Sequence, residues 1–387
     1  MNMNDEEIFQ DFITSRNLKY QTINVYKSSI AIYKELNKLT LKELLTEAEK
    51  EEDNGIPWKR RKLKQRLVNL RLFLYQKYLY STANIYLKQI QTIYRHYEIE
   101  IHPLPFISDR NVRKSKPVTY NDLPDHEIIK QSLKIAPPPM RAIILFISSS
   151  GTGRAETLNL TIQDFIDATI DYHKQDDIYE VMHLLKNRND IVPYLEMNRQ
   201  KMNKYYYTFC SPESTSETIH YLLGQKRRLK PENKLFKYNL RYLNNSFAEI
   251  NNKLQLGKVG PYNRFRSHML RKFHSSQLLN DDNNFFSDKI NFLQGRSKNS
   301  TDRVYLLENP NKLKKDYIEA MHCLSIKWDY NKIDMKTPEY LEMENKVAEA
   351  ENIKNEMEDI KKRIMAIEQD DYIRQYETPD SIKQKYL

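Results

Sequence analysis

The amino-acid sequence predicts a mainly α-helical protein that also contains a small antiparallel β-sheet, an α+β arrangement. Apolar residues recur at helical spacing through most of the chain, which is the pattern of helices with one buried face. Glycine is rare, with 7 among 387 residues, so few positions favour tight turns. By contrast, residues 178–211 include three short runs rich in β-branched and aromatic residues, separated by polar segments. Such runs are typical of short strands.

The first 101 residues are predicted to form a helical domain. Apolar side chains spaced three and four residues apart mark its helices. They are Ile23, Tyr26, Ile30 and Tyr33; Leu63, Leu67, Leu70 and Leu74; and Tyr86, Ile90, Ile93 and Tyr97. Because helices with one apolar face are stabilised by packing against each other, we expect a small helical bundle.

A polar stretch with several prolines, residues 102–118, has the composition of a linker. A second domain is predicted over residues 119–325. Its segment 140–150 has the pattern of a buried helix, and the turn "GTGR" follows it. Three strands of a small antiparallel sheet are predicted at residues 178–185, 191–198 and 205–211. From about residue 214 onward the apolar spacing is helical again.

The last segment, residues 326–387, is predicted to be a helical tail. Its apolar residues alternate between spacings of three and four with one break, which is the pattern of a heptad seam. They are Tyr340, Met343, Val347, Ala350, Ile353, Met357, Ile360, Ile364 and Ile367. Such a seam can form a coiled coil with another subunit or pack back onto its own chain, and the spacing fits both.

Composition limits the class of protein. The chain has no run of about 18 apolar residues, so we expect no membrane span. Its acidic start, "MNMNDEEIFQ", lacks the layout of a secretion signal. Cys210 and Cys323 stand far apart and without metal-ligand spacing, which argues against a disulfide framework. We therefore expect a cytoplasmic protein without a membrane partner.

Charge is unevenly distributed along the chain. The net charge is +10, although residues 337–371 hold 11 acidic and only 5 basic side chains. Residues 59–77 contain eight basic side chains and no acidic one. A basic surface can serve solubility alone, but it also suits a polyanion, because Lys and Arg displace the counterions of phosphates. The side chains that we predict to bind nucleic acid are Lys59, Arg60, Lys62 and Arg66.

Six residues of the second domain follow one another in an order that suggests a shared site. They are Arg154 in "GTGRAETLNL", Lys201 in "RQKMNK", His268 and Arg271 in "HMLR", Arg296 in "LQGR", and Tyr305 in "TDRVY". Each of them alone has an ordinary explanation as a surface or packing residue. Together they supply the groups needed to transfer a phosphodiester to a tyrosine hydroxyl.

Each kind of side chain has a physical role in that reaction. Two arginines can hold the non-bridging oxygens of the phosphate, where charge accumulates in the transition state. Tyrosine is a weak nucleophile because its pKa is about 10, so it needs a base and cationic surroundings. A histidine can take the tyrosine proton, and a lysine on a hairpin can protonate the departing 5′ oxygen. We expect no metal or other cofactor for this set.

On these motifs the chain resembles the tyrosine recombinases, the phage-integrase family. "TGRAETLNLTIQDF" resembles the first box of that family, "HMLR" the second, and "LQGRSKNSTDRVY" the nucleophile box. The resemblance covers roughly residues 119–325, with the N-terminal helices in the place of the family's SAM-like core-binding domain. It implies double-stranded DNA as substrate, a 3′-phosphotyrosyl intermediate, strand exchange without an energy cofactor, and a homotetramer acting on two duplexes. "LQGR" and "TFCSPES" look most like the archaeal viral and proviral branch.

The resemblance also implies roles for individual residues. Arg154 and Arg271 would clamp the scissile phosphate. Lys201 would protonate the leaving 5′ hydroxyl, His268 would serve in acid–base chemistry, and Tyr305 would be the nucleophile.

The sequence departs from the family pattern at two positions. Glu156 follows Arg154 by two residues, where the family usually has Glu at the third residue. Arg296 stands where His or Trp is usual, although an arginine can still donate a hydrogen bond to the phosphate. Lys204 lies in the same turn as Lys201 and is an alternative for the catalytic lysine.

Two other functions fit part of the pattern. A type IB topoisomerase uses a related set of residues, but it would relax supercoils as a monomer. A DNA-binding protein that descends from a recombinase and has lost catalysis is the second alternative. The separate basic domain and the heptad tail favour a multimeric recombinase over both.

Overall fold

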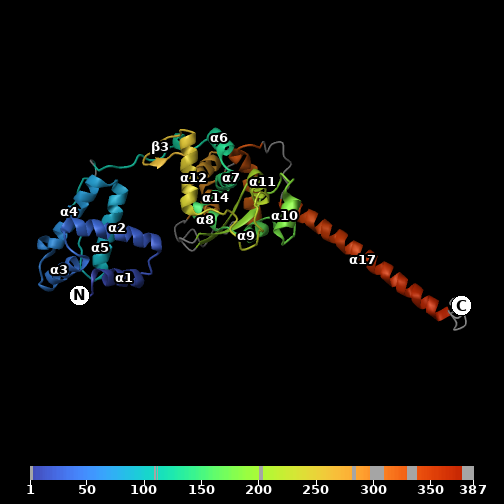
Figure 1. Cartoon of the computed structure of the whole chain (residues 1–387), viewed down its shortest axis with the longest axis horizontal. Helices are drawn as coiled ribbons and strands as arrows, with labels where there is room; N and C mark the ends of the chain where they lie inside the picture. The colour runs from blue at the N-terminus through green and yellow to red at the C-terminus, as the bar shows by residue number, and fades with distance from the viewer. Residues whose placement is uncertain are drawn as a thin grey trace. The chain divides into compact units, whose positions relative to one another are not determined.

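The computed structural model describes residues 3–108, 110, 112–199, 204–280, 285–296, 309–328 and 338–376. The chain divides into two compact units, residues 1–117 and 118–387, each with its own hydrophobic core (Figure 1). In the part of the chain that the structure describes, no helix is both long enough and apolar enough to cross a membrane.

The N-terminal unit is the predicted helical bundle. Its helices are α1 (Asp5–Ser15), α2 (Tyr20–Asn37), α3 (Leu41–Asp53), α4 (Lys62–Lys77) and α5 (Tyr80–His96), with a 3₁₀ turn η1 (Trp58–Arg60). The α4 stripe of four leucines is fully buried. Between α2 and α5, the hydroxyls of Tyr33 and Tyr94 lie 3.0 Å apart in the core, so these buried polar atoms satisfy each other.

The start of α1 also fixes the start of α3. Asp5 accepts hydrogen bonds from the backbone N–H groups of Leu41 (3.1 Å) and Lys42 (2.9 Å). These groups lie in the first turn of α3, where N–H donors have no partner within the helix. Lys34 of α2 donates to the same carboxylate at 2.5 Å, so one side chain joins three helices.

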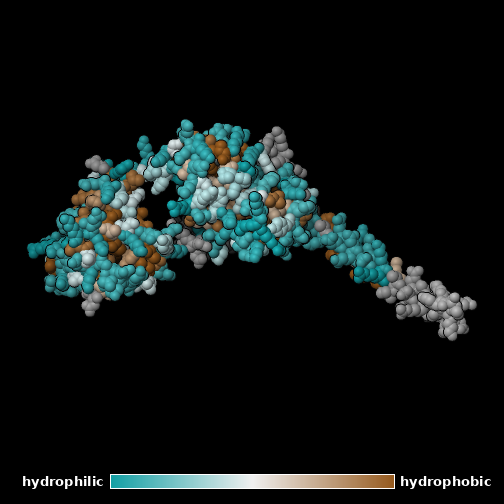
Figure 2. Space-filling view, viewed as in Figure 1, coloured by the Kyte–Doolittle hydropathy of each residue, from teal (hydrophilic) through white to brown (hydrophobic). Residues whose placement is uncertain are grey.

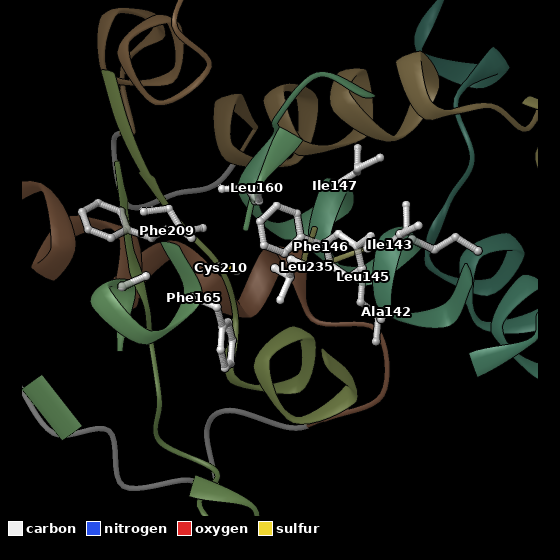
Figure 3. Packing of buried hydrophobic residues seen from close by; sticks show 14 of the residues in the cluster. Ala142, Ile143, Leu145, Phe146, Ile147, Leu160, Phe165, Phe209, Cys210 and Leu235 are labelled. Carbon is white, nitrogen blue, oxygen red and sulfur yellow. The ribbon is translucent and has the colours of Figure 1, made fainter. Parts of the chain in front are cut away.

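The C-terminal unit is built around α7 (Pro138–Ser150), which is buried along almost its whole length. Its flanking helices are α6 (His126–Ile135), α8 (Arg154–Asn159), α9 (Ile162–Ala168), α10 (Ile178–Leu185), α11 (Pro212–Leu223), α12 (Leu240–Lys253), α13 (Ser267–Leu279), α14 (Ser287–Leu293) and α16 (Pro310–Ala320). Figure 3 shows Ile143, Phe146 and Ile147 of α7 among side chains from other elements of this core. Helix α7 packs against α11 and α13, as a helix that is apolar on all sides requires.

Short elements complete this unit. Three 3₁₀ turns are η2 (Tyr120–Asp122), η3 (Ile170–Tyr172) and η4 (Met321–Leu324). Strands β1 (Tyr194–Arg199) and β2 (Lys204–Phe209) pair antiparallel, with Tyr194 opposite Phe209 and Arg199 opposite Lys204. A second small pair joins β3 (Lys258–Val259) to β4 (Tyr262–Asn263). The mainly α fold with a small antiparallel sheet is therefore confirmed, and the predicted strands at 191–198 and 205–211 are present with shifted ends.

The third predicted strand, residues 178–185, is wrong, because this segment is helix α10. Asp177 accepts hydrogen bonds from the backbone N–H groups of Tyr179 and Glu180 at 2.8 and 3.2 Å and so starts a helix. The buried residues of the segment are Ile178, Val181, Met182 and Leu185. Their spacing places them on one face of a helix, and this pattern outweighs the strand preference of single residues.

The tail contains α17 (Pro338–Tyr376), a single helix of 39 residues (Figure 1). Two of its side chains contact the turn η3 and the loop that follows it. Asn345 donates a hydrogen bond to the carbonyl of Asp171 at 3.2 Å, and Glu349 forms an ion pair with Lys174. The face of the C-terminal unit seen in Figure 2 is mostly hydrophilic.

Candidate active site

One carboxylate in the C-terminal unit holds two arginines from distant parts of the chain. Glu156 in α8 places Oε1 at 3.3 Å from Nε of Arg199, at the end of β1, and Oε2 at 3.5 Å from NH1 of Arg271 in α13. We call these three residues the Glu156 cluster. Arg271 is buried, whereas the side chain of Arg199 is 24% exposed. Burial lowers the pKa of Arg271, and the neighbouring Glu156 opposes that change. Arginine keeps its charge under these conditions.

Backbone carbonyls fix the orientation of both guanidinium groups. Arg271 donates from NH1 to the carbonyl of Gly151 at 2.7 Å and from NH2 to the carbonyl of Gln294. Arg199 donates from NH1 to the carbonyl of Gly295 at 2.8 Å. Charged donors that are held this way are pre-oriented for an anion.

The two glycines of this site have conformations that favour glycine. Gly151 ends α7 with φ of +65°, and Gly295 follows α14 with φ of +57°. A Cβ atom on Gly151 would lie 2.6 Å from Nδ1 of His274, and one on Gly295 would lie 2.6 Å from the ring of Tyr206. Side chains at these positions would be strained and would also displace their neighbours.

The Arg296 backbone is joined to the hairpin by a lysine. Lys204, the first residue of β2, donates from Nζ to the carbonyl of Arg296 at 2.8 Å. Burial and the positive charge of Arg199 lower the pKa of the Arg296 guanidinium. Strand β2 and the segment after α14 are therefore adjacent.

His268 lies in the first turn of α13 and is exposed. Arg271 follows it by three residues, so the two side chains project from the same side of the helix. Partial desolvation lowers the pKa of His268, and the charges of Lys272, Arg266, Arg271 and Arg296 lower it further. Since the ordinary value is 6.5, His268 is largely neutral at pH 7 and can accept a proton.

His274, six residues after His268 in α13, has a different role that the sequence did not predict. It is fully buried, and its Nδ1 lies 3.0 Å from Nε2 of Gln294. Burial, with Arg271 and Arg296 nearby, lowers its pKa to about 3, so it stays neutral. The same Gln294 amide donates to the carbonyl of Arg271 at 3.0 Å. His274 therefore positions the segment that carries Gly295, and it is not a candidate acid or base.

Arg154 is exposed at the start of α8. Within the described ranges its guanidinium has one hydrogen bond, from NH1 to Oδ1 of Asn244 in α12, at 2.9 Å. It lies two residues from Glu156 but takes no part in the Glu156 cluster. Sequence reasoning assigned the phosphate clamp to Arg154 and Arg271, whereas the structure brings Arg199 to Arg271.

Tyr305 and Lys201 lie outside the described residues. Two other tyrosines can be compared with the predicted nucleophile. Tyr206 is buried, donates to Oε2 of Glu156 at 3.1 Å, and has a pKa raised by burial and by that carboxylate. Tyr317 is buried and donates to the carbonyl of Ser149 at 2.9 Å. Both hydroxyls are used in packing, so neither competes with Tyr305 for the role of nucleophile.

The predicted DNA-binding residues of the N-terminal unit divide into two groups. Lys59 and Arg60 are exposed, and Lys62, which is 69% exposed, pairs with Glu47 at 3.2 Å. Arg66 is held inside the unit, because it donates to both oxygens of Glu47 (2.7 and 3.1 Å) and to Asn37 (2.8 Å). Lys59 and Arg60 are therefore the better candidates for phosphate contacts, and Arg66 joins helices.

The described residues contain no group of three or more His, Cys, Asp or Glu side chains arranged to hold a metal ion. The Glu156 cluster holds two guanidinium groups in place with one carboxylate and with backbone carbonyls.

Comparisons with known proteins give no family and no curated relative: no family model matches the chain, and no curated protein matches its sequence. Solved structures do match. The XerH site-specific recombinase bound to its difH substrate has 16% identity and a TM-score of 0.47, covering 80% of this chain and 82% of that one. The Tn1549 transposon integrase in complex with transposon right end DNA has 14% identity and a TM-score of 0.46, covering 83% and 98%. A lambda integrase tetramer bound to a Holliday junction has 12% identity and a TM-score of 0.44, covering 77% and 79%. At these values we base no functional conclusion on the likenesses.

Proposed function

We propose that this chain is a tyrosine-type site-specific DNA recombinase, or integrase, that cleaves and rejoins DNA through a 3′-phosphotyrosyl intermediate. The observation that carries the proposal is the Glu156 cluster, in which Arg199 and Arg271 are fixed beside the segment that leads to Tyr305. The guanidinium group of Arg271, held in place in this way, suits a phosphodiester better than a neutral substrate, because charge develops on the phosphate oxygens in the transition state.

The roles in the reaction follow the chemistry of each side chain. Arg154 and Arg271 contact the non-bridging oxygens, and Arg154 leaves Asn244 to do so. His268, neutral at pH 7, accepts the proton of the Tyr305 hydroxyl as that oxygen attacks phosphorus. The bond from phosphorus to the 5′ oxygen breaks, and Lys201 or Lys204 donates a proton to that oxygen. Rejoining reverses these steps with a 5′ hydroxyl from the partner strand.

Arg296 and Arg199 complete the cationic surroundings. Arg296 lies next to the hairpin through the bond from Lys204 to its carbonyl. We propose that its guanidinium donates to the phosphate in place of the His or Trp that is usual in the family. Arg199 acts through Glu156 and the Gly295 carbonyl and is therefore a positioning residue.

We propose double-stranded DNA as the partner, bound by both units, with four copies acting on two duplexes inside the cell. The exposed Lys59 and Arg60 support DNA contact by the N-terminal unit. The motifs "LQGR" and "TFCSPES" favour the archaeal viral and proviral branch as the origin of the protein.

A joining assay tests the function against its alternatives. Two pools of supercoiled plasmids with different markers and randomised inserts are incubated with the protein, and molecules that carry both markers are sequenced. We expect joined molecules at a recurrent sequence for the wild type and for Tyr205→Phe, a matched control at an exposed tyrosine. Tyr305→Phe should bind DNA and join nothing.

Other results would favour the alternatives. Relaxation of the plasmids without joining would support a topoisomerase, and DNA binding with neither reaction would support a protein that has lost catalysis. Joined molecules made by Tyr305→Phe would contradict the nucleophile assignment.

A further inference from the structure

The segment that joins α11 to α12, together with the first turn of α12, carries a dense run of positive charge. Residues 224–241, "GQKRRLKPENKLFKYNLR", contain seven basic side chains and one acidic side chain, Glu232. Arg227 is partly buried, and the other six basic side chains are exposed. We call these six the basic strip; they are Lys226, Arg228, Lys230, Lys234, Lys237 and Arg241. A segment with this excess of one charge raises the local positive potential and attracts polyanions.

The backbone of the basic strip is fixed to the C-terminal unit. The side chains of Leu229, Leu235 and Phe236 are buried in the core of this unit. Leu235 donates from its backbone N–H to the carbonyl of Leu160 at 2.8 Å, and Leu229 donates to the hydroxyl of Tyr179 at 2.8 Å. Because these contacts already order the backbone, binding through the strip costs less conformational entropy than binding through a free loop would.

Among the described residues, no acidic side chain pairs with the basic strip. The ion pairs that acidic side chains of residues 154–253 form use other cations. Glu156 holds Arg199 and Arg271, and Glu249 of α12 pairs with Lys253 at 2.7 Å. A surface that serves solubility alone mixes charges of both signs, so the excess of positive charge indicates a binding surface.

Helix α8 connects the basic strip to the predicted phosphate site. Lys234 donates from Nζ to the carbonyl of Asn159, the last residue of α8, at 2.7 Å. Arg154, the first residue of α8, donates to Asn244 of α12, and Arg241 stands three residues before Asn244 on the same side of that helix. The six residues of α8 span about 9 Å. Since base pairs follow each other about every 3.4 Å along a duplex, the strip begins within about three base-pair steps of Arg154.

We propose that the basic strip binds the phosphate backbone of double-stranded DNA next to the phosphate that is cleaved. The inference rests on the proposed function, because it takes duplex DNA as the substrate and Arg154 as a ligand of the cleaved phosphate. It extends that function, because the DNA contacts expected from the sequence at residues 59–66 belong to the other unit. Phosphate contacts carry no sequence information directly, so the strip contributes affinity at any sequence and leaves the choice of site to other residues.

The first experiment measures the affinity of the full-length protein for a short duplex of arbitrary sequence by fluorescence anisotropy at several salt concentrations. The strip variant combines three substitutions of exposed cations, Arg228→Gln, Lys230→Gln and Lys237→Gln. We expect the slope of log K against log salt to fall by about two to three, because each lost phosphate contact lowers the slope by about 0.9.

The matched control removes three exposed cations from α6 and α16 through Lys130→Gln, Lys134→Gln and Lys315→Gln. It should keep the slope of the wild type, since the total charge changes by the same amount and the strip is intact. Equal slopes for the strip variant and the wild type, or an equal fall in the control, would overturn the proposal. Loss of binding to phosphatidylserine vesicles in the strip variant, with an unchanged DNA slope, would assign the strip to a membrane surface and would also overturn it.

The second experiment measures single-turnover cleavage at saturating protein concentration. A backbone contact binds the ground state and the transition state equally, so the strip variant should cleave at the wild-type rate within about twofold. A much slower rate with an unchanged salt slope would place these residues in the chemistry and contradict a backbone contact. A wild type that binds duplex DNA and cleaves none would contradict the proposed function, while the salt slopes would still decide the role of the strip. A wild type that binds no duplex DNA would contradict both.

Discussion

Arg199 and Glu156 are joined by an ion pair of 3.3 Å between Nε and Oε1, although 43 positions separate them in the chain. The pair links the end of the β1–β2 hairpin to the start of α8. Oε2 of the same carboxylate lies 3.5 Å from NH1 of Arg271. Glu156 therefore binds both the hairpin and α13. Movement of either element would disturb both guanidinium groups.

Loss of the Glu156 charge should therefore affect catalysis more than DNA binding. In Glu156→Gln the two arginines lose their common anion and their fixed placement. A displacement of about 1 Å can cost about 10²-fold in rate, so we expect cleavage to slow by about that factor. Single-turnover cleavage and DNA affinity should be measured together, with Glu127→Gln on the exposed face of α6 as control. Equal losses in affinity and rate would contradict this role.

Arg154 and its partner Asn244 should respond differently to substitution. If Arg154 leaves Asn244 to hold the phosphate, Arg154→Ala removes a transition-state contact and should slow cleavage by about 10²–10³-fold. Asn244→Ala removes only the resting partner and should change the rate by less than about threefold. A large effect of Asn244→Ala with a small effect of Arg154→Ala would remove Arg154 from the clamp.

The pH dependence of cleavage tests His268. Desolvation and four nearby cations lower its pKa below 6.5, and the neutral form is the one that accepts a proton. The rate should therefore fall only as pH drops below about 6.5. Lys272→Met removes one of the lowering charges, so the acidic limb should move to higher pH. An acidic limb that does not move, while Lys272→Met stays folded, would argue against His268 as the base.

A substrate with sulfur in place of the bridging 5′ oxygen identifies the proton donor. A thiolate leaves without protonation, so this substrate should restore cleavage to a variant that lacks the acid. We expect rescue of either Lys201→Ala or Lys204→Ala, and the rescued variant is the one that has lost the acid. Lys204 also donates to the carbonyl of Arg296, and loss of that contact should not be rescued. Rescue of neither variant would contradict a lysine acid from this hairpin.

The crowding around Gly151 predicts that alanine there lowers the stability of the protein more than alanine at an uncrowded glycine. Gly151→Ala introduces strain at φ of +65° and a contact of 2.6 Å with His274, and we expect a loss of about 2–3 kcal/mol in the free energy of unfolding. Gly257→Ala is the matched control, since φ is +71° and no atom lies within 4 Å of the added Cβ. It should cost about 1 kcal/mol. Denaturant unfolding of both variants measures the difference, and equal losses would show that crowding at Gly151 is unimportant.

Substitution of the basic residues of the N-terminal unit should affect either DNA binding or stability, depending on the residue. Lys59→Ala with Arg60→Ala should weaken DNA binding and lower the slope of log K against log salt by about two, one for each phosphate contact. Arg66→Ala breaks the contacts with Glu47 and Asn37 and should lower the melting temperature. Filter binding at several salt concentrations and thermal unfolding distinguish these outcomes. An unchanged slope in the double variant would place the DNA contacts elsewhere.

The sequence predicted the parts of the fold that depend on periodicity. The leucines of α4 are buried as their spacing required, and α17 is a helix over the whole of the predicted seam. The prediction failed at residues 178–185, where β-branched residues favoured a strand. The helix cap at Asp177 and the buried face of α10 decided the structure there.

The site was predicted only in part, because its contacts are long-range. His268 and Arg271 were found from their spacing on one helix. Arg199 was missed, since nothing near it in sequence marks it, and its contacts with Glu156 and Gly295 arise from tertiary packing. The position of Glu156 in the sequence departs from the family pattern. In the structure this residue forms ion pairs with two arginines.

The proposed function depends most directly on a covalent bond between Tyr305 and DNA. Cells that express the wild type, Tyr305→Phe or Tyr205→Phe are lysed in denaturant, and DNA that remains attached to the protein is recovered and sequenced. We expect attached DNA with a recurrent sequence for the wild type and Tyr205→Phe, and none for Tyr305→Phe. Equal recovery from Tyr305→Phe, or recovery from none of the folded proteins in cells that contain the target DNA, would contradict it.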